Sequence, residues 1–197
     1  MIPDAKKKRA TKKTAAPKRS SLRIFTIGHS NRPIEEFIRL LEAHGVKHVI
    51  DIRTIPRSRH NPQFNADVLP KSLRAAGIDY TPMKELGGLR HTTRDSINTG
   101  WKNASFRGFA DYMQTPEFAA AIDALIKIAA DKTTAIMCAE AVPWRCHRSL
   151  VADALVARQI DVEHILSATR AQPHEMTSFA RVHGLEITYP VQGNLAL

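Results

Sequence analysis

Short apolar runs alternate with amphipathic segments from residue 22 onward, and this alternation limits the folds open to the chain more than any other feature. The predicted strands are 23–27, 46–52, 78–83, 133–138 and 162–166. The predicted helices are 34–41, 65–76, 109–113, 118–130, 150–157 and a segment between His174 and His183. Strands that alternate with helices form a mostly parallel sheet covered on both faces. We therefore predict an α/β fold, a single Rossmann-like three-layer domain over residues 22–197, with a long surface loop at 91–108.

Residues 1–21 differ in composition from the rest of the chain. They hold eight lysines and arginines against one aspartate, and so supply most of the formal net charge of +10. With almost no large apolar side chain, they cannot offset the entropy lost on ordering. We expect a disordered basic tail, which is either a solubilising extension or a loose, salt-sensitive contact for nucleic acid.

Several protein classes are excluded by composition. No run approaches the ~20 apolar residues of a membrane span, and no secretory signal is visible, so we expect a cytoplasmic protein without a membrane partner. Two cysteines in 197 residues do not make a disulfide framework. A reducing cytosol leaves both available for catalysis or for a metal.

Polar side chains follow four of the predicted strands at the point where each strand ends. They are His29 and Ser30, Asp51 and Arg53, Glu85, and Cys138 and Glu140. Ligands of open parallel sheets bind outside the carboxyl ends of the strands, so we expect one pocket there. Asp51 with Arg53 and Arg57 indicates an anion site, although Arg53 can instead pair only with Asp51. His29 is either a catalytic group or part of a helix cap.

Both cysteines lie in one loop that leads into a predicted helix, Cys138 to Ser149. Cys146 stands beside Arg145, His147 and Arg148, whose positive charges would stabilise its thiolate. Arg148 in the first helical turn can bind a phosphate, sulfate or carboxylate together with free helix N–H groups. His147 is a candidate acid, base or metal ligand, and Glu140 can position it.

Three chemistries fit this loop. A thiolate nucleophile above an anion site supports phosphoryl, sulfuryl or glycosyl-type transfer. The second is a metal site formed by Cys138, Cys146 and His147. Seven residues separate the two cysteines, whereas the cysteine pairs of zinc sites are usually closer together in the sequence. A binding pocket for a nucleotide or phosphate is the third.

The chain resembles the family labelled domain of unknown function 488 (DUF488). The matching segments are 26–31, Asp51-Ile52-Arg53 with Pro56, Arg57 and Ser58, Glu85-Leu86-Gly87-Gly88, 109–113, and Cys138-Ala139-Glu140 followed by Cys146-His147-Arg148. The resemblance covers nearly the whole body from Ile24 to about Leu166, and it implies a compact α/β domain with its signature residues at one end of a sheet. It supplies no reaction and no cofactor.

A weaker likeness exists to rhodanese and cysteine-phosphatase folds, which also place a cysteine loop between a strand and a helix that carries an arginine. Those loops have five residues between the cysteine and the arginine, whereas Cys138 and Arg145 are separated by six and Cys146 and Arg148 by one. No catalytic assignment is carried over from those families.

The sequence predicts an enzyme, a cysteine-dependent transferase or hydrolase, that binds a phosphate-bearing or other anionic ligand such as a nucleotide. The predicted catalytic residues are Cys138, Glu140, Cys146, His147, His29 and Asp51. The predicted ligand-binding residues are Arg148, Arg53, Arg57, Ser30 and Glu85. The alternatives are a nucleic-acid-associated module that uses the tail and the arginines of 53–59, and a Cys/His metalloprotein.

Overall fold

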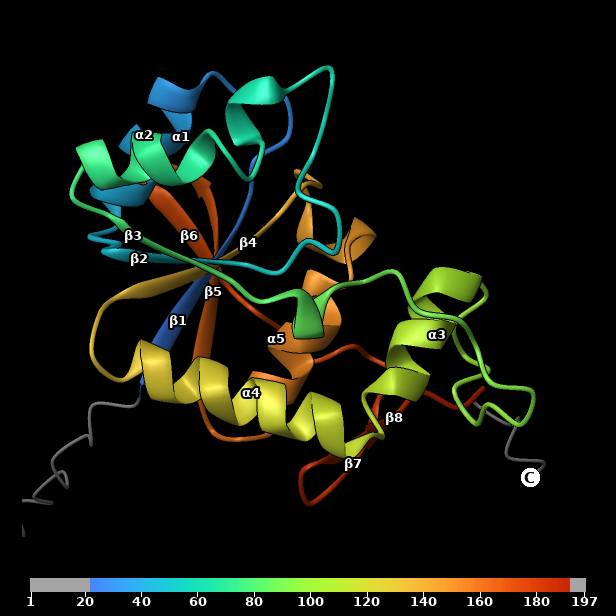
Figure 1. The fold of residues 1–197 in the computed structure, drawn as a ribbon. Helices are drawn as coiled ribbons and strands as arrows, with labels where there is room; N and C mark the ends of the chain where they lie inside the picture. Colours follow the sequence, from blue (N-terminus) through green and yellow to red (C-terminus); the bar gives the residue numbers. More distant parts are fainter. Residues whose placement is uncertain (1–21, 192–197) are drawn as a thin grey trace, which may run out of the picture.

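A six-stranded sheet forms the centre of the structure, with helices on both faces (Figure 1). The structure is a computed structural model that describes residues 22–191. The strand order is β3-β2-β4-β1-β5-β6; the first five strands are parallel and β6 is antiparallel to β5. The strands are β1 (Arg23–Gly28), β2 (His48–Asp51), β3 (Asp79–Pro82), β4 (Thr134–Cys138), β5 (Asp161–Ser167) and β6 (Arg170–Pro173). The predicted mostly parallel α/β fold is confirmed, and the predicted tail lies outside the described residues.

Two helices cover each face of the sheet and bury separate apolar cores (Figure 1). One face packs against α1 (Ile34–Ala43) and α2 (Leu69–Ala75), and the other against α4 (Pro116–Ala129) and α5 (Arg148–Val156). The helix α3 (Ala104–Tyr112) joins the second core through Phe109. None of the helices of residues 22–191 is long and apolar enough to cross a membrane.

The sheet order places the carboxyl ends of three strands next to one another. β4 lies between β1 and β2, with Gly28 opposite Cys138 and Asp51 opposite Met137 in the parallel register. The chain continues the pairing past the strand ends, because the His29 amide donates to Cys138 O (3.0 Å) and the Ile52 amide to Met137 O (3.0 Å). Residues that follow β1, β2 and β4 therefore share one edge.

The C-terminal part differs from the prediction. The segment between His174 and His183 is not a helix: β6 ends just before it, and β7 (Arg181–His183) pairs with β8 (Glu186–Thr188) in a separate two-stranded sheet. The reason is a buried carboxylate on α5. Asp153 accepts hydrogen bonds from the Thr177 amide (3.0 Å) and His174 Nε2 (2.7 Å), so tertiary partners replace helical ones.

The predicted loop at 91–108 is shorter than expected, because α3 already begins at Ala104. Asn103 is its N-cap, and the side-chain oxygen accepts from the amides of Ser105 (2.8 Å) and Phe106 (3.4 Å). Three short 3₁₀ helices complete the described elements: η1 (Pro62–Phe64), η2 (Lys84–Leu86) and η3 (Pro143–Arg145).

Candidate functional site

Two thiols and an imidazole meet at the end of β4. Ligand atoms of Cys138, Cys146 and His147 all lie within 4.8 Å of one another, the one such cluster of three possible metal ligands within residues 22–191. Cys146 Sγ lies 3.8 Å from His147 Nδ1 and accepts a hydrogen bond from the Arg148 amide at 3.4 Å. The three side chains line a pocket of about 430 Å³, within the size range of small-molecule sites. We call this hollow the thiol pocket.

The two thiols are not equivalent. A hydrogen bond from Cys146, helped by His147 and the charge of Arg148, lowers the pKa of Cys138 well below its usual range, despite burial of the sulfur. The pKa of Cys146 is raised, because its proton is held by the hydrogen bond to Cys138 and because the group is buried. Cys138 is therefore the thiolate of the pair and Cys146 its proton-bearing donor.

Arg148 lies beneath the loop between the two cysteines and is almost fully buried. Its guanidinium donates to three main-chain oxygens: Ile27 O (3.0 Å), Glu140 O (3.1 Å) and Ala141 O (3.3 Å). Burial lowers its pKa, whereas the nearby thiols favour its charged form. The predicted ligand-binding arginine thus spans the ends of β1 and the loop, and its charge acts on the thiolate from below.

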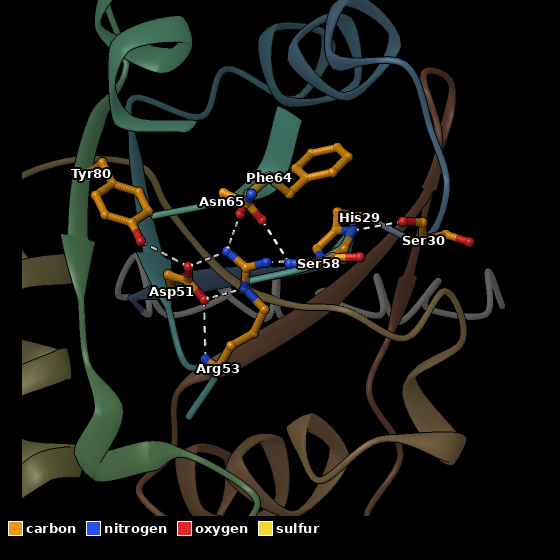
Figure 2. Close-up of polar contacts among 8 residues, drawn as sticks. All are labelled: His29, Ser30, Asp51, Arg53, Ser58, Phe64, Asn65 and Tyr80. Atoms are coloured by element: carbon orange, nitrogen blue, oxygen red, sulfur yellow. Dashed lines mark hydrogen bonds and ion pairs between the residues drawn. The ribbon is translucent and has the colours of Figure 1, made fainter. Parts of the chain in front are cut away.

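Arg53 forms a buried pair with Asp51 after β2 (Figure 2). Its Nε donates to Asp51 Oδ1 (2.9 Å) and its Nη2 to Asp51 Oδ2 (2.6 Å), which is a two-point contact, and Nη2 also donates to Phe64 O (2.8 Å). The Tyr80 hydroxyl donates to Asp51 Oδ2 (2.8 Å), and burial together with Asp51 raises the pKa of Tyr80. The carboxylate of Asp51 is therefore fully engaged as an acceptor.

His29 completes this network from the end of β1. Its ring stacks on Phe64 with the ring centres 4.2 Å apart, Nδ1 lies 2.7 Å from Ser30 O, and Nε2 lies 3.1 Å from Arg53 Nη1 (Figure 2). Burial lowers the pKa of His29 to about 4, outweighing the Ser30 hydrogen bond that raises it. These hydrogen-bond partners indicate that the His29 ring is neutral, with Nδ1–H donating to Ser30 O and Nε2 accepting from Arg53.

One N–H of Arg53 remains for a ligand. Four of its five N–H groups have the partners just named, and within residues 22–191 the second N–H of Nη1 has none. Arg53 also lines the thiol pocket. The Asp51–Arg53 network and the thiol cluster therefore border the same hollow.

Close backbone approaches hold the pocket in shape. A Cβ atom on Gly88 would lie 2.4 Å from His147 Nδ1, and one on Gly87 would lie 2.3 Å from Thr54 Oγ1. At Gly28 it would lie against the main-chain oxygen of Glu140. No side chain fits at Gly28, where the close neighbour is main chain, and a side chain at Gly88 would have to displace the His147 ring.

The structure separates some of the predicted site residues from the others. Cys138, Glu140, Cys146, His147 and Arg53 line the thiol pocket, and His29 and Asp51 lie directly behind Arg53. Arg57 is exposed and lines a different hollow with Lys84, and Glu85 is exposed outside the thiol pocket. Ser30 shapes the turn after β1, with φ of 52° and its amide donating to Ala139 O (2.8 Å).

Sequence reasoning missed other members of the site. Tyr80 and Phe64 contact Asp51 and His29 but carry no pattern of their own in the sequence. Gly88 belongs to the Gly87-Gly88 pair of the DUF488 resemblance, and it packs against His147. The Gly-Gly pair was a usable signal, since two adjacent glycines often mark a close backbone approach.

The family profile described as "Domain of unknown function DUF488" matches residues 33–155, more than half of the chain and most of the described region. The chain belongs to the DUF488 family. This family match confirms the resemblance predicted from the sequence, and its range includes both cysteines of the thiol pocket. No curated protein and no solved structure matches the chain significantly.

Proposed function

We propose that this DUF488 protein is a thiol-dependent transferase or hydrolase that acts on a phosphate-bearing or other anionic substrate, with Cys138 as its nucleophile. One observation carries the proposal. A cysteine whose pKa is lowered by a hydrogen-bonding thiol and a buried arginine lines a pocket large enough for a small molecule. Activated thiolates of this kind are typical of catalytic cysteines rather than structural ones.

The neighbouring groups have separate duties in this proposal. Cys146 and Arg148 stabilise the thiolate. Arg53, through its remaining N–H, and the exposed side chain of Arg145 bind the substrate anion, since both residues line the pocket. Asp51 and neutral His29 fix the orientation of Arg53, so they act as positioning residues.

The covalent step follows from this arrangement. Cys138 sulfur donates an electron pair to the electrophilic phosphorus, a sulfur–phosphorus bond forms, and the bond between phosphorus and the leaving oxygen breaks. The leaving group departs with that electron pair and takes a proton from water. A second water, or an acceptor hydroxyl, then attacks phosphorus, loses its proton to solvent and releases the Cys138 thiolate.

Alkylation with iodoacetamide tests the identity of the nucleophile. In the wild-type protein, Cys138 is expected to react at a lower pH than Cys146, as located by peptide mass spectrometry. In Cys146→Ala, which removes the donor, the reaction of Cys138 should shift to higher pH because its thiolate loses a hydrogen bond. Methylphosphonate should slow the alkylation of Cys138 in the wild type, and Arg145→Gln should weaken that protection. Equal reactivity of both thiols, or no protection at any concentration, contradicts the proposal.

A metal site is the second candidate function, favoured by the position of Cys138, Cys146 and His147 within 4.8 Å of one another. Thiolates and imidazole are ligands that zinc prefers, and the pocket side would leave a position open for substrate. Metal analysis of protein purified without added zinc or iron tests it. Near-stoichiometric metal that is lost in both Cys138→Ser and Cys146→Ser would favour this function over thiolate catalysis.

A further inference from the structure

Exposed apolar side chains line the mouth of the thiol pocket. Among the described residues, the most exposed large apolar side chains are Ile55, Leu89 and Trp144, each 65% exposed. Ile55 and Leu89 line the thiol pocket together with Phe106, whereas Trp144 lines a different hollow. An apolar side chain that stays in water does not contribute the free energy that its burial would add to stability. Apolar side chains that gather at one pocket mark a binding surface, unlike scattered ones.

Two contacts connect the segments of this apolar wall to each other and to the thiol cluster. The Leu89 amide donates to Thr54 Oγ1 (3.3 Å), which joins the segment of Leu89 to that of Ile55. The preceding residue, Gly88, packs directly on the ring of His147. The backbone that carries Leu89 is therefore held next to His147 of the thiol cluster.

Phe106 forms the aromatic part of this wall. It lies in the first turn of α3, and its ring centre is 4.7 Å from that of Trp101, which supports it from behind. A ring held in this way can receive a second ring by stacking or edge contact.

Polar and charged side chains line the same pocket. They are Glu140, Arg145 and Arg53, which line it together with Cys138 and His147. A volume of about 430 Å³ is several times that of a phosphate group. The pocket therefore offers a thiol and cationic side chains together with apolar side chains, in a space larger than an inorganic anion fills.

Building on the proposed function, we infer that the substrate is an amphipathic anion, an aryl ester of phosphate or a similar acid. Its anionic head reaches Cys138 while its aromatic ring lies against Ile55, Leu89 and Phe106. The ring is then the leaving group or is attached to it, and it departs with the electron pair of the broken ester bond and a proton from water. Ile55 and Leu89 are the specificity-determining residues.

Two phosphonates with the same head group test this inference, because their carbon–phosphorus bond is not cleaved by the proposed step. Methylphosphonate and phenylphosphonate would be compared by the concentration that halves the iodoacetamide alkylation rate of Cys138. Burial of a phenyl ring predicts protection at a concentration about tenfold lower for phenylphosphonate. Ile55→Ser and Leu89→Ser should each remove most of this advantage and leave protection by methylphosphonate unchanged.

The matched control is Val182→Ser, which removes an exposed apolar side chain on β7 outside the pocket. It should leave both phosphonates as effective as in the wild type. If methylphosphonate protects and phenylphosphonate is no better, the aromatic substrate is refuted while the proposed function stands. If neither phosphonate protects, the anion site itself fails, and the inference fails with it. Circular dichroism of each variant establishes that the fold is retained.

Discussion

His29 should remain neutral in the folded protein far below the pH at which free histidine protonates. Its pKa is lowered from 6.5 to about 4 because the ring is buried between Phe64 and Arg53. Protonation would turn Nε2 from an acceptor into a donor facing the Arg53 N–H, so two cations would meet in a buried space.

The fall in pKa sets the size of the effect on stability. In the unfolded chain His29 takes up its proton near pH 6.5, and in the folded chain only near pH 4. The unfolded state therefore binds one more proton between these values, and the free energy of unfolding decreases as the pH falls. The slope is about 1.4 kcal/mol per pH unit, and the total loss about 3 kcal/mol. Above pH 6.5 the contribution is fully present.

Urea unfolding at pH steps from 7.5 to 4 measures this slope in wild type and in His29→Gln. The variant is less stable at neutral pH, but its slope should be shallower by about 1.4 kcal/mol per pH unit. His164 is buried and its pKa is lowered to about 3, so the wild-type slope includes a similar contribution that His29→Gln retains. His60→Gln, at an exposed histidine, controls for loss of a ring as such. Equal slopes in wild type and His29→Gln, or an NMR titration of His29 near pH 6.5, would refute the reasoning.

Three further substitutions probe the neighbouring contacts. Arg148→Met should lower the free energy of unfolding in urea by more than about 3 kcal/mol, because three carbonyl oxygens lose a charged donor. Arg148→Lys should recover only part of this loss, since an ammonium group cannot reach all three oxygens. Equal stability of Arg148→Met and wild type would contradict this role. Gly88→Ala should cost about 1–3 kcal/mol and slow Cys138 alkylation, because the new methyl displaces His147; unchanged alkylation would show that the ring position does not matter. Tyr80→Phe should cost about 1.5–3 kcal/mol through loss of the hydrogen bond to Asp51, as seen in thermal unfolding, and an unchanged midpoint would argue against that bond.

The sequence allows the parallel part of the fold to be predicted, together with the edge of the sheet where the candidate site residues meet. Apolar runs of strand length and amphipathic helices are local patterns, so β1 to β5 and α4 were predicted close to their observed bounds. The convergence of residues after β1, β2 and β4 followed from a general property of parallel sheets. The segment after β6 was mistaken for a helix because its conformation depends on Asp153, a partner more than twenty residues earlier in the sequence.

The roles of the arginines could not be predicted from the sequence. Arg148 stands at a helix start, where a bound anion is the usual expectation, yet its donors reach main-chain oxygens that no residue pattern encodes. The sequence also does not show which cysteine has the lowered pKa, because the opposite shifts of Cys138 and Cys146 come from the hydrogen bond between the two sulfurs. Both the partners of Arg148 and the pKa values of the two thiols depend on how closely atoms of different chain segments approach one another.

The way Arg148 holds the loop has a consequence for how this protein can diversify. In this loop its guanidinium binds the main-chain oxygens of Glu140 and Ala141, so these contacts do not depend on the side chains at the two positions. The exposed side chains from Ala139 to Arg145 can therefore be exchanged while the thiols beside them keep their geometry. A library randomised at Glu140, Ala141, Trp144 and Arg145 should contain many folded proteins with altered ligand preference. This loop is therefore a suitable segment for engineering.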